Sequence, residues 1–351
     1  MSAYTSHNRK ILLFLLIATQ LILSGCGARS SPDLTRIFAV ARAQKGKPPL
    51  IIIPGTLGTE LINSRTGEVV WPSAFRSKDD GLSLPITPDI AANKDDLVPG
   101  KILVTAKFAR LFPAVNIYRQ FLDSLKNAGG YREGDWNNPP ADGDHDTYYV
   151  YSYDWRRDNV ESARNLIRDI RNLKQKFRLP DLRFTIIGHS MGGLVARYAA
   201  MYGDTDLPPE GSKYTAKWTG SSDIDKILMF GTPNSGSMES FATLLDGYSI
   251  TNGTRRRVRL LRMLSAEDIL SIPAIFQLLP YGHEARFLNE NLQPISLDLF
   301  NAETWKKYGW SSTFNSDFRN RFARGNIASD RKPQSSTTLA DLDAYFTNTL
   351  V

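Results

Sequence analysis

Short apolar runs and helical stripes alternate along the middle of the chain. Four runs rich in β-branched and aromatic residues lie at 50–53, 147–151, 183–187 and 226–230. Such runs predict strands, and the unbroken apolar run at 50–53 predicts one that is buried on both faces, as in a parallel sheet. Between the later runs, apolar residues recur at helical spacing over 158–177 and 192–202. This alternation predicts βαβ units and an α/β fold, with helices on both faces of the sheet.

Composition and pattern also indicate how the chain is organised. They predict a signal peptide (1–25), a tether (26–46), a core (47–237) with a loop-rich insertion (62–112), a cap or lid (238–335) and a C-terminal helix (336–351). The cap is predicted because apolar helical patterns replace strand patterns past Pro233. Residues 281–335 show no buried strand, and their pattern predicts no defined element.

The first 26 residues have the order of a secretory signal. Arg9 and Lys10 precede a thirteen-residue apolar run, and Leu23-Ser24-Gly25-Cys26 follows it. Thirteen residues at about 1.5 Å each fall short of a bilayer core of about 30 Å, so a signal peptide is expected. The last four residues resemble the bacterial lipobox, which implies acylation of Cys26 and a lipid anchor in the cell envelope, with Gly27 favouring the outer membrane. A plain signal peptide that contains Cys and an uncleaved anchor are the alternatives.

Overall composition excludes several classes of protein. One Cys in 351 residues excludes an internal disulfide framework and multi-cysteine metal sites, and we expect neither a metal nor a cofactor. Hydrophobic residues form 42% of the chain and aromatic residues 11%, which is typical of a folded protein. The formal net charge is +7, but no base-reading motif is present, so nucleic acid is not an expected partner.

The strongest chemical signal is the segment Gly188-His189-Ser190-Met191-Gly192-Gly193, between a predicted strand and a predicted helix. A Ser at the apex of a tight strand-to-helix turn has a strained backbone, and glycines on both sides leave room for the turn. The pattern predicts a nucleophile elbow, with Ser190 as the nucleophile and the N–H of Met191 available to an oxyanion. A structural turn without chemistry is the alternative.

A second glycine-containing turn, residues 54–58, follows the first predicted strand. Its glycines allow the backbone to curl toward the nucleophile, so the amide of Thr56 or Leu57 is expected to join that of Met191 at the oxyanion. A plain turn is the competing interpretation. His189, although adjacent to the nucleophile, is interpreted as structural.

Five segments together resemble those of a known enzyme family. They are Pro54-Gly55-x-x-Gly58-x-x-Leu61, Tyr153-Asp154-Trp155-Arg156, Gly188-His189-Ser190-Met191-Gly192-Gly193, residues 230–237 and residues 305–310. The combination resembles the lecithin:cholesterol acyltransferase family over about residues 50–310. The resemblance implies an α/β-hydrolase fold with a cap and a membrane-binding lid, and acyl transfer from phospholipids or other lipid esters to water or an alcohol. It implies Ser190 as nucleophile, Thr56 and Met191 as oxyanion amides, and residues 154–156 near the acyl site.

A serine nucleophile needs a base, and the base needs a carboxylate, in the chain order Ser, acid, His for this fold. The histidines of the chain are His7, His145, His189 and His283. Because only His283 follows Ser190, it is the candidate base, with an acid such as Asp268. The competing explanation is truncation relative to the family, with loss of the last sheet strands and of the Asp and His that they carry.

The sequence therefore predicts an exported, lipid-anchored serine esterase, lipase or O-acyltransferase that works through an acyl-enzyme. Lipid esters or phospholipids are the expected substrates, and the membrane is the expected partner through the N-terminal anchor. The alternative is a catalytically inactive or truncated hydrolase-like lipoprotein, which binds lipid or is a fragment.

Overall fold

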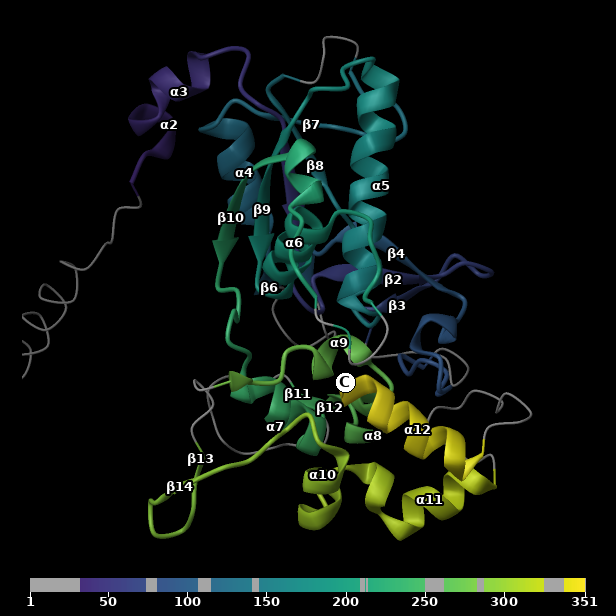
Figure 1. The fold of residues 1–351 in the computed structure, drawn as a ribbon. Coiled ribbons are helices and arrows are strands. Elements are labelled where there is room, and N and C mark those ends of the chain that lie inside the picture. The colour runs from purple at the N-terminus through teal and green to yellow at the C-terminus, as the bar shows by residue number, and fades with distance from the viewer. Residues whose placement is uncertain are drawn as a thin grey trace, which may run out of the picture.

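A computed structural model describes most of the chain (Figure 1). The described residues are 32–73, 81–106, 115–140, 145–208, 212, 214–249, 262–282, 287–324 and 338–350. The predicted signal peptide, the predicted acylation site Cys26 and the candidate base His283 lie outside these residues. Among the described residues, no helix has both the length and the apolar character needed to cross a membrane.

A parallel sheet forms the centre of the molecule. Its strands are β1 (Leu50–Ile53), β7 (Arg132–Glu133), β8 (Thr147–Val150), β9 (Phe184–His189) and β10 (Ile224–Phe230). They lie in the order β10-β9-β1-β8-β7, and every neighbouring pair is parallel. The four predicted strands are confirmed, and so is the α/β class.

Alternate residues of β1 explain why this strand is apolar throughout. Ile51 and Ile53 belong to the larger hydrophobic core, together with side chains of helices α5 (Asn159–Phe177) and α6 (Met191–Tyr202). Leu50 and Ile52 belong to a second core that includes Leu122 of helix α4 (Arg119–Asn127). Successive strand residues point to opposite faces, so β1 has helices on both sides and all four of its residues are buried.

Helix α5 shows how the local sequence sets one boundary. The carboxylate of Asp158 accepts a hydrogen bond of 2.8 Å from the amide of Val160, which caps the helix. The sequence has the spacing of a capping box, but of its two bonds only the one from Val160 to Asp158 is used, because the carboxylate of Glu161 pairs with Arg157. At the other end, Arg178 takes a left-handed conformation and ends the helix two residues before Pro180.

Part of the predicted loop-rich insertion folds into small sheets. The strands are β2 (Thr59–Asn63), β3 (Val69–Trp71) and β4 (Leu97–Ile102) in the antiparallel order β3-β2-β4, and β5 (Thr105–Ala106) pairs with β6 (Val115–Asn116). The side chain of Trp71 is almost completely buried. Strands β3, β4 and β5 thus lie within the loop-rich segment 62–112, while β6 and most of β2 lie outside it, and Leu61, Val70 and Leu97 of these strands belong to the larger core.

Short helices gather beyond the carboxyl ends of the central strands (Figure 1). They are α7 (Met238–Asp246), α8 (Ala266–Leu270), α9 (Pro273–Phe276), α10 (Ala302–Tyr308), α11 (Ser316–Ala323) and α12 (Leu339–Leu350), with the hairpins β11 (Tyr248–Ser249)–β12 (Arg262–Leu264) and β13 (Phe287–Leu288)–β14 (Pro294–Ile295). Trp305 is fully buried and packs against Phe276 and Phe346. Helices α10 and α11 lie within residues 281–335, for which the sequence predicted no defined element, and they belong to this group of short helices.

Three elements, the helices α2 and α3 and the strand β10, have unusually exposed apolar residues. Helices α2 (Leu34–Ile37) and α3 (Ala39–Ala43) bury no residue, and Figure 1 shows them beside the body of the protein. Strand β10 lies at one edge of the described sheet, and Leu228, Met229 and Phe230 are 46%, 42% and 54% exposed. Within the described residues, β10 therefore has a strand neighbour on one side only.

Candidate active site

Ser190 lies at the turn between β9 and α6, with a backbone that few residues other than Gly adopt. Its φ is 52° and its ψ is −126°. The turn is held by a hydrogen bond of 2.8 Å from the Ser190 amide to the Phe230 carbonyl on β10, and by one of 3.0 Å from the Gly193 amide to the Ser190 carbonyl. The turn therefore has the strained strand-to-helix geometry expected of a nucleophile elbow.

The glycines around Ser190 are required by close packing. A Cβ on Gly188 would lie 2.6 Å from the Cα of Gly193, and one on Gly192 would lie 2.4 Å from the carbonyl oxygen of Ile53. A Cβ on Gly193 would lie 2.0 Å from Oγ1 of Thr232. Real Cβ atoms essentially never come this close to another heavy atom, so a larger residue would push the elbow away from its neighbours.

The loop of residues 54–58 contacts the elbow directly. A Cβ on Gly55 would lie 2.7 Å from the Cβ of Ser190, and the Thr56 hydroxyl donates to the Met191 sulfur at 3.4 Å. In the described part of the chain, the amides of Thr56 and Met191 have no hydrogen-bond acceptor. Two open N–H groups on either side of a serine form the donor set that an oxyanion needs.

Aromatic side chains from distant segments fix this loop by hydrogen bonds to its backbone. Tyr153 donates to the carbonyl of Pro54, Tyr118 accepts from the amide of Gly55, Trp71 donates to the carbonyl of Leu57, and Trp155 donates to the carbonyl of Thr59. The distances run from 2.9 to 3.1 Å. Because all four hydrogen bonds are made to backbone atoms, the shape of the loop depends little on its own side chains.

Tyr118 also contacts His189, the residue before Ser190. Its hydroxyl lies 2.7 Å from Nδ1 of His189 and 2.9 Å from the amide nitrogen of Gly55. The amide can only donate, so the hydroxyl proton is directed to Nδ1, and the imidazole carries its proton on Nε2. Burial raises the pKa of Tyr118 to about 12 and lowers the pKa of His189. His189 is therefore a neutral structural link between elbow and loop, as expected.

A cavity of about 280 Å³ opens at Ser190. Its lining comes from the 54–58 loop, the elbow, Trp155, the loop after β10 and the cap. The lining residues are Thr56, Leu57, Trp155, Ser190, Gly231, Pro233, Ser237, Glu239, Ser240, Thr243, Tyr248, Leu264, Ile269, Ile275 and Leu278. Most of the exposed lining is apolar, contributed by Leu, Ile and Trp side chains. Ser190 thus lies at the wall of a pocket suited to an apolar chain.

Comparison with known protein families gives a result that agrees with this geometry. A profile described as "Lecithin:cholesterol acyltransferase" matches residues 115–329, more than half of the chain. The chain belongs to the lecithin:cholesterol acyltransferase family. Membership supports, at a general level, a lipid-ester hydrolase or acyltransferase, and the central sheet with its flanking helices is the α/β-hydrolase arrangement.

Among solved structures, the chain is similar to one in "The crystal structure of Tle4-Tli4 complex". The two share 13% sequence identity with a TM-score of 0.46, and the match covers 88% of this chain and 70% of that chain. No curated protein sequence matches the chain.

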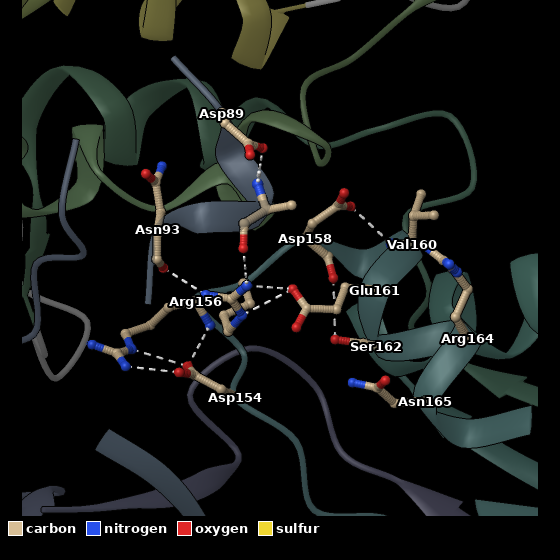
Figure 2. Close-up of polar contacts among 12 residues, drawn as sticks. Asp89, Asn93, Asp154, Arg156, Asp158, Val160, Glu161, Ser162, Arg164 and Asn165 are labelled. Atoms are coloured by element: carbon tan, nitrogen blue, oxygen red, sulfur yellow. Dashed lines mark hydrogen bonds and ion pairs between the residues drawn. The ribbon is translucent and has the colours of Figure 1, made fainter. Parts of the chain in front are cut away.

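The segment Asp154-Trp155-Arg156, part of the family resemblance, divides its side chains between two environments. Trp155 lines the Ser190 cavity, while Arg156 is completely buried away from it. All five N–H donors of Arg156 have acceptors, namely both carboxylate oxygens of Asp154 and of Asp95 and the carbonyl of Leu82. Figure 2 shows the bonds to Asp154. Burial opposes the charge, but the two carboxylates raise the pKa of Arg156 above its usual value. Arg156 therefore ties the insertion to the core.

The described histidines do not supply a base for Ser190. His145 precedes β8, and because the strands are parallel it lies at the amino edge of the sheet, opposite Ser190. His189 is bonded to Tyr118. Neither of them hydrogen-bonds to the Ser190 hydroxyl in the described part of the chain.

Asp268, the acid proposed from sequence, has a structural role instead. Its carboxylate accepts from the amide and hydroxyl of Ser265, closing the capping box of α8, and from the hydroxyl of Ser83. Its oxygens are used by these bonds, so the assignment of Asp268 as an orienting acid is not supported by its contacts.

Three site residues were missed by sequence reasoning. Tyr118 and Trp71 hold the oxyanion loop, and Glu239 lines the cavity. No motif marks the two aromatic residues, because their bonds join segments far apart in the chain. Glu239 lies two residues after the helix-capping Ser237, the last residue of the segment 230–237.

Proposed function

We propose that this protein is a lipid-ester acyl hydrolase or O-acyltransferase in which Ser190 forms an acyl-enzyme. The observation that carries the proposal is the strained Ser190 turn beside two unpaired amides at the wall of a largely apolar cavity. Family membership supports lipid esters as the general substrate class. The cavity wall accepts the acyl chain and excludes water around the reacting carbonyl.

The reaction uses two acyl transfers. Oγ of Ser190 bonds to the ester carbonyl carbon, its proton passes to a base, and the amides of Thr56 and Met191 stabilise the oxyanion. The bond to the alcohol then breaks, and the base returns the proton to the leaving oxygen. Water or a second alcohol repeats these steps on the acyl-enzyme and releases the acyl group with the Ser190 hydroxyl restored.

We propose His283 as the base. It follows Gly282 directly in the chain, and the described residues before it pack against the loop after β10. The Tyr281 hydroxyl donates to the Asn234 carbonyl at 2.9 Å, and a Cβ on Gly236 would lie 2.3 Å from the Cα of Pro280. That loop leaves β10 at the carboxyl edge of the sheet, which is the edge that carries Ser190. This placement of its neighbours supports His283 over His145.

We propose that the protein works as an exported lipoprotein of the cell envelope, anchored through Cys26 and with the outer membrane as its site. The order of basic, apolar and small residues before Cys26 supports this proposal. Acylation of the chain at Cys26, detected as a mass increase that the substitution Cys26→Ser abolishes, is the expected result in an exporting bacterial host.

One observation favours a second function, a lipid-binding protein without turnover. Within the described residues, no histidine contacts the Ser190 hydroxyl, and a serine without its base keeps only residual catalysis. The apolar cavity would then hold a lipid chain without cleaving it.

A fluorophosphonate probe separates the two functions because it phosphonylates a serine only when that hydroxyl is activated. The full chain is treated with the probe and digested, and the modified peptide is identified by mass spectrometry. We expect the adduct on Ser190, with loss of labelling in Ser190→Ala and strong reduction in His283→Ala. Absence of an adduct on the folded full chain would instead support the lipid-binding function.

A further inference from the structure

The segment of residues 33–45, which contains helices α2 and α3, exposes a row of apolar side chains. Leu34, Ile37, Phe38 and Val40 are 39%, 61%, 47% and 86% exposed, and neither helix buries a residue. Leu34, Ile37 and Phe38 have the spacing i, i+3 and i+4, which places them on one face of a helix. Contiguous exposed apolar residues mark interaction sites, whereas scattered ones are ordinary. This face is therefore a candidate interaction surface.

The C-terminal end of this segment is fixed to the body of the protein. The carboxylate of Asp146 accepts from the amides of Gly46 and Lys47 at 3.0 and 3.1 Å and forms an ion pair of 2.7 Å with the Lys47 ammonium. The Arg42 carbonyl packs so closely on Gly130 that a Cβ there would lie 2.7 Å from its oxygen. These contacts hold α2 and α3 beside the body and leave their apolar side chains open (Figure 1).

Three cations accompany the exposed apolar side chains. Arg36, Arg42 and Lys45 are exposed, and within the described part of the chain none of them makes an ion pair. The acid of residues 33–45 is Asp33, whose carboxylate accepts from the Arg36 amide at 3.1 Å and so caps α2. Three basic residues against one acidic residue leave the segment positively charged. Its partner should therefore be both apolar and anionic.

An anionic membrane surface fits both features better than a second copy of the chain. Two copies that met through this face would bring Arg36, Arg42 and Lys45 close to the same cations of the other copy, and like charges oppose association. A membrane interface accepts apolar side chains, and its phosphate groups attract cations. Helices of four and five residues are far too short to cross a bilayer, so α2 and α3 would lie along its surface.

We propose that residues 33–45 dock on an anionic lipid surface, with the four exposed apolar side chains in the interface and the three cations at the phosphate groups. The proposed acylation site Cys26 lies seven residues before Asp33, so an anchor there would keep the segment within about 25 Å of the lipid. Because a single lipid chain binds a membrane only marginally, an adjacent docking surface strengthens the attachment. Docking does not require the catalysis proposed for Ser190.

A fluorophore within the segment tests this docking however the rest of the chain reaches the membrane. In the full chain with Cys26→Ser, which removes the single native thiol, Val40→Cys is labelled with a nitrobenzoxadiazole dye, whose emission strengthens and shifts to the blue in lipid. Val69→Cys is the matched control, because Val69 is also an exposed valine, at 45%, and lies on β3. With vesicles of phosphatidylcholine and phosphatidylglycerol, we expect the blue shift and quenching by nitroxide-labelled lipid at position 40 and neither at position 69.

Further substitutions in the chain labelled at position 40 separate the apolar and the electrostatic contributions. Phe38→Ser should raise the lipid concentration for a half-maximal response by about tenfold or more, because one apolar side chain no longer enters the lipid. Arg36→Gln and Arg42→Gln should each raise it by about fivefold with the anionic vesicles. None of the three changes should lower Tm, since the segment buries no side chain. Ser190→Ala should respond like its parent.

Three results would overturn the proposal. The first is a label at position 40 that stays in water when anionic vesicles are added, or one that responds no more than the label at position 69. The second is an equal response to vesicles of phosphatidylcholine alone. The third is a blue shift in buffer without lipid, because another part of the chain or a second copy would then cover the segment. Hydrolysis of a soluble ester by the same chains tests the function proposed for Ser190 separately, so either proposal can fail while the other stands.

Discussion

The Tyr118 hydroxyl accepts a hydrogen bond from Gly55 and donates one to His189, and this arrangement holds only for a neutral imidazole. A proton on Nδ1 would leave the hydroxyl proton of Tyr118 without an acceptor in a buried site. The lowered pKa of His189, caused by its burial, agrees with this description. The link between the elbow and the oxyanion loop therefore depends on the protonation state of one side chain.

A stability measurement at two pH values tests this link. Because the pKa of His189 is lower in the folded chain than its unfolded value of about 6.5, the unfolded chain binds more protons below that pH. We expect the free energy of unfolding to fall as the pH drops from about 6.5 toward the lower, folded pKa. Urea unfolding at pH 7.5 and at about pH 5.5 measures the loss, which should be smaller in His189→Gln.

The ion-paired carboxylate of Asp146 contributes little to this pH window. The pKa of Asp146 is lowered to about 2, since the bonds to Lys47 and Gly46 outweigh the effect of burial, so its contribution is present above its unfolded pKa and is lost only at more acidic pH. An equal loss of stability in wild type and His189→Gln would contradict the role given to His189.

At the level of single residues, the sequence allowed candidate site residues to be proposed where a local turn restricts which residue types fit. Ser190, Met191 and Thr56 were proposed because glycines at fixed positions mark the two turns, and the structure brings these two turns into contact. Tyr118 could not be found, because its bond to Gly55 spans 63 residues and nothing near Tyr118 requires a hydroxyl. Asp268 was misassigned because its chain position fits an acid, while its oxygens serve a helix cap.

At the level of elements, unbroken apolar runs predicted the central strands, and weaker patterns failed. Strand β4 contains Pro99 and Gly100, which normally argue against a strand, but they are tolerated because β4 pairs with β2 alone. The cap helices α8 and α9 have five and four residues. They are too short to show a helical stripe, and their burial comes from packing against distant segments.

Strand β10 provides a test of the described sheet edge. Leu228, Met229 and Phe230 are exposed on a strand with one strand neighbour, a pattern that promotes association through the open edge. We expect Met229→Lys to leave Tm unchanged and to reduce aggregation measured by light scattering. Ile186→Lys, a change of the same kind at a fully buried position of the neighbouring strand β9, should abolish folding. A large loss of stability in Met229→Lys would show that other residues cover this edge.

At the level of the whole molecule, the two ends of the central strands carry different features. Helices α2 and α3 precede β1 and lie toward the amino edge of the sheet (Figure 1). Ser190 follows β9 and therefore lies at the carboxyl edge. The six residues of β9, at about 3.3 Å each, separate the edges by about 20 Å.

The buried charges of Arg156 join the insertion to the core, so their loss should destabilise the whole protein. We expect Arg156→Met to lower the free energy of unfolding by about 3–5 kcal/mol, because Asp154 and Asp95 would remain buried without their cation. Arg65→Met is the matched control, since its ion pair with Asp96 is exposed and is worth less than about 1 kcal/mol. Urea unfolding measures both variants, and similar losses would contradict the role given to Arg156.

Release of acyl groups from a lipid ester tests the central claim most directly. The full chain and Ser190→Ala are incubated with phosphatidylcholine vesicles that carry a labelled acyl chain, with and without an added alcohol. We expect the wild-type chain to yield labelled fatty acid or a labelled new ester and to carry the label on Ser190 when the reaction is stopped by acid, and Ser190→Ala to yield neither. Equal release by the two chains, or no release by the folded wild-type chain, would contradict the account.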